Sequence, residues 1–202
     1  MHTFLRWGIL GAALGMVADI CLLYHPGGFY TDPAYQFLTD ISYLRLLAGH
    51  YIGILAIPLE LVGFYALYYH GFKNQQQSLV WFFVSAFILI VGVAYHATIG
   101  VIATVLREDP DVSHYFSSLK LFFKPLGILL MAGFLLLSMM MFYYIYSHKT
   151  IWPRNYAWVN PLLLYLFWIF IYFVFPPLGF VLVVSGFNLS ILLFFCFYYF
   201  IR

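Results

Sequence analysis

Apolar stretches long enough to cross a bilayer recur along this 202-residue chain, with short polar breaks between them. A helix rises about 1.5 Å per residue, so about 20 apolar residues cover the hydrocarbon core of a membrane. Six stretches meet this requirement, at residues 7–24, 45–70, 79–106, 111–146, 156–175 and 178–201. The pattern predicts an all-α polytopic membrane bundle of six transmembrane helices, forming a single domain over residues 1–202.

The longest polar connection covers residues 25–44. Its Asp32-Pro33 pair is typical of the N-cap and first residue of a helix, which predicts a short helix at the membrane surface. Either Asp40 or Ser42 can then cap the second span. Asp111 or Ser113 can start the fourth helix in the same way.

The second span carries two ionisable residues, His50 and Glu60, that lipid would tolerate poorly. Their spacing places them on one helical stripe with Gly53, about 15 Å apart along the axis. This stripe is expected to face protein or water. An ionisable residue inside a span is a functional-site hypothesis by default.

Small residues mark similar stripes on two other spans. On the first span Gly8, Gly11 and Gly15 lead to Asp19, and on the third span His96 lies between Gly92 and Gly100. Glycines at spacings of three and four let another helix approach closely. His96 is therefore expected to point into a helix contact. Asp19 either faces such a contact too or caps and anchors the helix near its end.

Depth along the spans brings these side chains to one level. Asp19, His50 and His96 lie roughly 6–10 Å from their span midpoints, all toward the same side. Because helices joined by short loops pack side by side, we expect these three groups to line one pocket, with Glu60 deeper as a neutral carboxyl or proton reservoir. Side chains that could ring its mouth and bind substrate are Arg45, His25, Arg107 and Lys124. Asn188 adds a hydrogen-bonding group near mid-membrane.

Composition supports a membrane location, since 65% of residues are hydrophobic and only 8% are charged. The net charge of +2 gives no reason to expect nucleic acid as a partner. On the side with the termini lie Arg6, Lys73, Lys149, Arg154 and Arg202, against Arg45, Arg107, Lys120 and Lys124 on the other. This asymmetry predicts that both termini are cytoplasmic.

A carboxylate beside an imidazole is the minimum for general acid/base chemistry, and an unperturbed imidazole has a pKa of about 6.5. With 18 Tyr and 23 Phe residues, aromatic walls could hold a hydrophobic substrate. Asp19, His50 and His96 would also suit a metal ion. The chain has no H-x-x-x-H, H-E-x-x-H or cysteine cluster, so the sequence favours a site without metal. A haem between His50 and His96 fits their depth alone. The cofactor remains unknown from the sequence.

Two short runs carry a family resemblance. Residues 42–50, S-Y-L-R-L-L-A-G-H, and residues 92–97, G-V-A-Y-H-A, resemble an uncharacterised family of bacterial multi-pass membrane proteins. The resemblance implies a bacterial inner membrane and no particular activity. The chain lacks the paired-histidine motif of alkaline-ceramidase-like hydrolases. It also lacks the G-x-S-G motif of rhomboid proteases. Neither of these two families of polytopic membrane enzymes is therefore indicated by motif.

Three function classes remain open. The chain could be a membrane-embedded acid/base enzyme acting on a lipid or isoprenoid-like substrate, in a pocket open to the non-cytoplasmic side. It could instead be a non-catalytic lipid-binding or accessory subunit, or a small-solute or proton-coupled transporter. The oligomeric state cannot be read from the sequence. Cys21 and Cys196 fall on opposite sides of the membrane, so we expect no bond between them.

Overall fold

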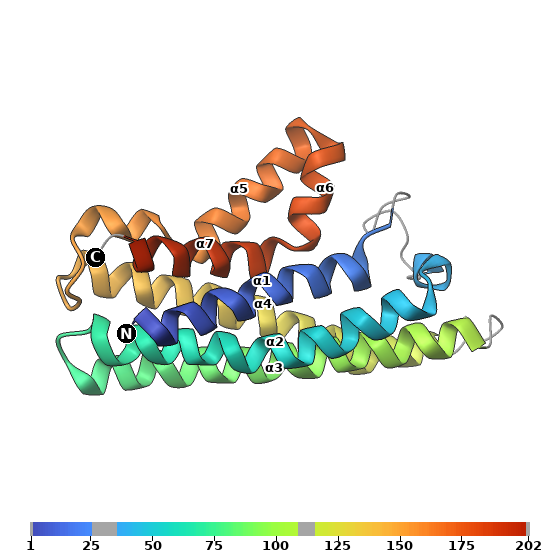
Figure 1. The fold of residues 1–202 in the computed structure, drawn as a ribbon, viewed down its shortest axis with the longest axis horizontal. Helices are drawn as coiled ribbons and strands as arrows, with labels where there is room; N and C mark the ends of the chain where they lie inside the picture. Colours follow the sequence, from blue (N-terminus) through green and yellow to red (C-terminus); the bar gives the residue numbers. More distant parts are fainter. Residues whose placement is uncertain (1, 26–35, 109–115, 201–202) are drawn as a thin grey trace.

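Four long helices form the main bundle of the protein (Figure 1). The computed structural model describes residues 2–25, 36–108 and 116–200, and it contains no β-strand within those ranges. The four helices are α1 (His2–Leu23), α2 (Tyr43–Gly71), α3 (Gln75–Glu108) and α4 (Phe116–Tyr146). Each contains a segment long and apolar enough to cross a membrane. Helix α2 packs between α1 and α3, and α4 packs on α3.

Two short 3-10 helices connect the long ones. Helix η1 (Gln36–Asp40) precedes α2, and η3 (Arg154–Trp158) follows α4. Ser42 is the N-cap of α2 and accepts a hydrogen bond from the Arg45 backbone N–H, which confirms one of the two predicted caps. The predicted helix start at Asp32-Pro33 and the caps at Asp111 and Ser113 lie outside the described residues.

The C-terminal third differs from the prediction of two full spans. Helix α5 (Pro161–Val174) has 14 residues and so extends about 21 Å, less than the ~30 Å of a hydrocarbon core. The next apolar stretch is broken into α6 (Pro176–Val184) and α7 (Gly186–Phe200), which are bent by 77°. By length and composition the described chain has four spanning helices, or five if the bent pair counts as one span. Six spans are therefore not confirmed.

Local sequence explains both departures. Asn160 caps α5 through its side chain, which accepts from the Leu162 N–H, and Pro161 follows as the first helical residue. The helix therefore begins five residues after the predicted position 156. At the α6–α7 break, the Ser185 hydroxyl donates to the Val181 carbonyl at 2.9 Å. A Ser-Gly pair of this kind is a common place for a helix to bend.

Both termini lie at one end of the bundle (Figure 1). At this end the loop after α2 pairs with the loop after α4. The Lys73 N–H donates to the Lys149 carbonyl and the Ile151 N–H to the Gly71 carbonyl, each at 2.9 Å. Helices α5 and α6 project sideways from the bundle, and α7 returns along it toward the terminal end (Figure 1).

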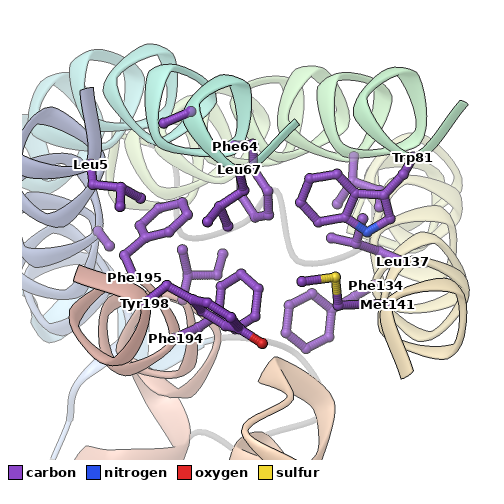
Figure 2. Close-up of a cluster of buried hydrophobic side chains, with 14 of the residues drawn as sticks. Leu5, Phe64, Leu67, Trp81, Phe134, Leu137, Met141, Phe194, Phe195 and Tyr198 are labelled. Carbon is purple, nitrogen blue, oxygen red and sulfur yellow. The ribbon is translucent and has the colours of Figure 1, made fainter. Parts of the chain in front are cut away.

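Two buried apolar clusters hold the bundle together. The larger one lies toward the terminal end and brings side chains of α1, α2, α3, α4 and α7 against one another (Figure 2). Its fully buried members include Leu5, Phe64, Trp81, Phe134 and Phe195. The second cluster joins η1 to the other ends of α1, α2, α3 and α4, and includes Leu22, Phe37, Leu38, Ile102 and Phe123.

The outer surface of the bundle is strongly apolar. Leu44, Leu55, Ile90, Leu121 and Phe173 are each between 66% and 78% exposed, whereas Asp19 and Glu60 are buried. This arrangement, apolar outside and ionisable inside, is the reverse of a water-soluble protein. It is compatible with a multi-pass membrane protein. Cys21 and Cys196 are both free, as predicted.

The glycine stripe of α1 allows close helix packing, as predicted. A methyl group at Gly8 would lie 2.6 Å from the Cα of Gly63 on α2. At Gly11 it would lie 2.6 Å from the backbone nitrogen of Glu60. Only glycine lets α1 and α2 approach this closely, and the approach brings Glu60 next to the helix that carries Asp19.

Candidate functional site

Asp19 on α1 is held between two polar side chains from other helices. Its Oδ1 lies 3.2 Å from Nε2 of His96 on α3, and its Oδ2 accepts a hydrogen bond of 2.7 Å from the side-chain amide of Asn188 on α7. The exposed fractions of Asp19 and His96 are 7% and 8%. These three residues therefore form a polar cluster inside the bundle, linking helices that lie far apart in the sequence.

Glycines make room for two members of the cluster, His96 and Asn188. A methyl group at Gly53 would lie 2.6 Å from Nδ1 of His96, and one at Gly15 would lie 2.7 Å from Cγ of Asn188. The imidazole of His96 thus packs closely against α2, and the amide of Asn188 packs against α1. This packing leaves Nδ1 of His96 buried without a hydrogen-bond partner in the described structure.

Glu60 on α2 lies in the same cavity. Its exposed fraction is 1%, and its Oε1 has no hydrogen-bond partner among the described residues. A buried carboxyl without a partner is costly in a protein interior, so it needs a proton, a ligand or water. Glu60 is thus the acidic group of this cavity with unused hydrogen-bonding capacity.

The cavity has a volume of about 280 Å³ and lies between the two apolar clusters. Its polar lining residues are Asp19, Glu60, His96 and Asn188 together with two tyrosines, Tyr95 and Tyr165. The other walls are apolar and come from α1 to α7, with Ile57, Leu89, Phe134, Val183 and Phe187 among them. This combination of apolar walls and a few convergent polar groups is typical of small-molecule sites.

His50 does not join this cluster. It lies in a separate groove between α2 and α3, lined by Tyr51, Val101 and Thr104 among others, where its Nδ1 packs against Gly100. Because α2 and α3 run in opposite directions, His50 meets Gly100 while His96 meets Gly53. Each histidine thus packs against a glycine of the other helix, and the two contacts lie at different levels along the helix axes. The haem hypothesis loses its basis, since only His96 lines the cavity.

The basic residues predicted at the pocket mouth have other partners. The Arg45 guanidinium donates to the carbonyls of Cys21, Ile20 and Tyr24 at the end of α1, and Arg107 donates to the Ile41 carbonyl at 2.5 Å. Both guanidinium groups therefore bind backbone carbonyls near the C-terminal end of a helix, Arg45 at α1 and Arg107 just after η1.

The other two predicted mouth residues lie away from the cavity as well. His25 lies 3.6 Å from Asp40, and Lys124 is exposed on α4. None of the four basic residues lines the cavity. No group of three or more His, Cys, Asp or Glu side chains that could hold a metal ion occurs in the described ranges.

The sequence matches the model of a family of unknown function, DUF6796, over residues 1–201. The chain belongs to this family. The match covers the whole bundle, including the polar cluster and the bent C-terminal helices. No curated protein and no solved structure matches the chain.

Sequence reasoning places Asn188 near mid-membrane without pairing it with Asp19. The sequence predicts aromatic walls in general, but it does not single out Phe134, Tyr165 and Phe187. A signal for Asn188 does exist, because Asn188 follows the Ser185-Gly186 break, and helix ends within a membrane often point at a polar site. The aromatic wall has no such signal in a chain where most helices carry aromatic residues.

Proposed function

We propose that this member of the DUF6796 family is a membrane-embedded enzyme that moves a proton to or from a hydrophobic substrate inside the 280 Å³ cavity. The observation that carries the proposal is the carboxylate–imidazole pair of Asp19 and His96, 3.2 Å apart, at the wall of a mostly apolar cavity. A carboxylate beside an imidazole is the minimum for general acid/base chemistry, and such a pair costs free energy to bury in a membrane, so a functional role explains its presence.

The proposed role of each polar residue follows from whether its side chain already has a hydrogen-bond partner. Nε2 of His96 lies 3.2 Å from Oδ1 of Asp19, and the Asn188 amide donates to the other carboxylate oxygen, Oδ2, which holds the carboxylate in position. Glu60 supplies the second acidic group, and its Oε1 has no partner in the described structure. A substrate in the cavity would therefore meet Glu60 directly, with the Asp19–His96 pair as the neighbouring proton store.

The membrane arrangement is proposed in the same way. Six apolar segments lie in a bacterial inner membrane with both termini in the cytoplasm, and α5–α7 enter and leave from the terminal side. Support comes from the basic residues at that end. Arg6, Lys149 and Arg154 contact tyrosine rings there, as interfacial side chains do, whereas Arg45 and Arg107 at the far end are occupied by backbone carbonyls.

Isotope incorporation tests the reaction even though the substrate is unidentified. The protein is reconstituted with a bacterial lipid extract in water enriched in both ²H and ¹⁸O, and the lipids are then analysed by mass spectrometry. A proton-transfer enzyme adds ²H at carbon, and a hydrolase adds ¹⁸O. We expect label in one lipid class with the unmodified protein and with Glu108→Gln, a change at the exposed end of α3.

The same label should be lost with Asp19→Asn, His96→Gln and Glu60→Gln, each of which keeps roughly the size of its side chain. Equal labelling by the unmodified protein and these three variants would refute the enzymatic role. Absence of label from every lipid would leave the binding or accessory function in its place.

A transporter is the second candidate because the α6–α7 helix is broken beside the polar cluster. The 77° bend at Ser185 lies three residues before Asn188, which contacts Asp19. Broken helices near mid-membrane are common at transport sites. Proton uptake by liposomes containing the protein, dependent on Asp19 and on an imposed pH gradient, would favour transport over catalysis.

A further inference from the structure

Acidic groups outnumber basic groups in the lining of the cavity. Two carboxyl groups, Asp19 and Glu60, face it, and the described lining includes one imidazole but no lysine or arginine. Asp19 already has His96 and Asn188 as partners. Glu60 is 1% exposed, and its Oε1 is left without a partner within the described ranges. The cavity thus presents one unpaired acidic group in a low-dielectric setting.

Aromatic rings from three other helices lie on the cavity wall. Tyr165 of α5 stacks on Phe187 of α7 with centroids 4.5 Å apart, and Phe134 of α4 meets Phe187 edge-on at 4.6 Å. Aromatic faces attract cations, most strongly where water is excluded. The same rings also pack well against neutral hydrocarbon. They therefore suit a ligand that is both apolar and positively charged.

We infer that the cavity binds a hydrophobic molecule that carries one cationic nitrogen, with its ammonium N–H donating to Glu60 and its apolar body against the aromatic wall. This inference deepens the proposed function, and it rests on that function for the premise that the cavity receives a substrate. Fatty acids and phospholipid phosphates are excluded as preferred ligands, because no lysine or arginine in the described lining would pair with their negative charge.

Three probes that share a dodecyl chain test the charge preference. They are N,N-dimethyldodecylamine, dodecan-1-ol and dodecanoate, titrated into the full-length protein in phosphatidylcholine nanodiscs, with empty nanodiscs subtracted. A hydrogen bond to a charged group is worth roughly tenfold or more in affinity. We therefore expect the amine to bind at least about tenfold more tightly than the alcohol, and dodecanoate to bind least.

Variants locate the binding to the cavity. Glu60→Gln should remove the preference for the amine, Glu60→Asp should keep much of it, and Glu108→Gln on the surface should leave it unchanged. Circular dichroism checks that each variant is folded, and Asp19→Asn provides the second test of the acidic wall. Equal affinity for all three probes, or an amine preference that survives Glu60→Gln in folded protein, would overturn the inference.

The outcome separates this inference from the proposed reaction. Isotope incorporation without an amine preference would leave the enzyme in place and reject the cationic ligand. A Glu60-dependent amine preference without isotope incorporation would keep the binding site and reject catalysis.

Discussion

Replacing Gly11 by Ala tests the packing that builds the site. A methyl group there would lie 2.6 Å from the Glu60 backbone nitrogen, 2.7 Å from the Ala56 carbonyl oxygen and 2.7 Å from Cβ of Leu59. Two of these three atoms belong to the backbone of α2 and cannot rotate away. Helices α1 and α2 would have to separate, and overpacking of this kind costs about 1–3 kcal/mol.

Gly92 on α3 provides a matched control, since it also lies on a buried helix face and lines the cavity. A methyl group at Gly92 would have Ile57 Cδ1 at 3.5 Å and Leu130 Cδ1 at 3.9 Å, which are ordinary contacts. Alanine is better than glycine in a helix interior by roughly 0.5–1 kcal/mol. We expect Gly92→Ala to be neutral or slightly stabilising. The free energy of unfolding of the Gly11→Ala variant should be roughly 2 kcal/mol lower than that of the Gly92→Ala variant.

The free energy of unfolding can be measured in mixed micelles by titrating a denaturing detergent and following circular dichroism. A second readout is amine binding, because the clash at Gly11 falls on the backbone of Glu60 itself. If the two alanine variants unfold at the same detergent fraction, the close α1–α2 contact does not exist in the folded protein. A loss confined to Gly92→Ala would show that the cavity wall is packed tightly where it is described as open.

Three further predictions concern other contacts. Asn188→Leu removes the amide that donates to Asp19, so the folded protein should lose about 1–3 kcal/mol in the same unfolding assay, and an unchanged stability would show that the hydrogen bond is absent. Arg45→Gln removes the hydrogen bonds to the carbonyls at the end of α1 and should lower the free energy of unfolding by about 1–2 kcal/mol. Unchanged stability would show that these hydrogen bonds do not contribute. In a cysteine-free background of intact cells, Asp40→Cys should react with an impermeant thiol reagent and Lys73→Cys should not, whereas equal reaction at both would contradict the proposed orientation.

Helical periodicity predicts which side chains leave the lipid, but not which neighbour they meet. The angle of a residue on its own helix follows from spacing alone, so the inward direction of Asp19 and His96 can be anticipated. Helix α2, however, has a helix on each side. Gly49 packs against Leu22 of α1, while His50, one residue later, packs against Gly100 of α3. A spacing argument cannot distinguish these two neighbours, which is why the predicted grouping of His50 with Asp19 is wrong.

The C-terminal helices illustrate a second limit. Apolar length alone predicts two full spans there, because residues 156–201 contain few polar breaks. The start signal at Asn160-Pro161 and the break at Ser185-Gly186 are short polar or conformational features inside that apolar run. The effect of these features depends on tertiary partners. Just after the break, for example, the Ser190 hydroxyl donates to the Gly186 carbonyl and accepts from the indole N–H of Trp168 on α5. Mean hydropathy averages such features away.

Two histidine–glycine contacts between α2 and α3, His50 with Gly100 and His96 with Gly53, limit how sequences of this family can change. A side chain at position 100 collides with the His50 imidazole, and one at position 53 collides with the His96 imidazole. Replacing either glycine would force the opposing imidazole to move from this position, and a displaced His96 would no longer pair with Asp19. Within the family, positions 50 and 100 should therefore vary together, as should 53 and 96. The pair that includes His96 should be the slower of the two to change.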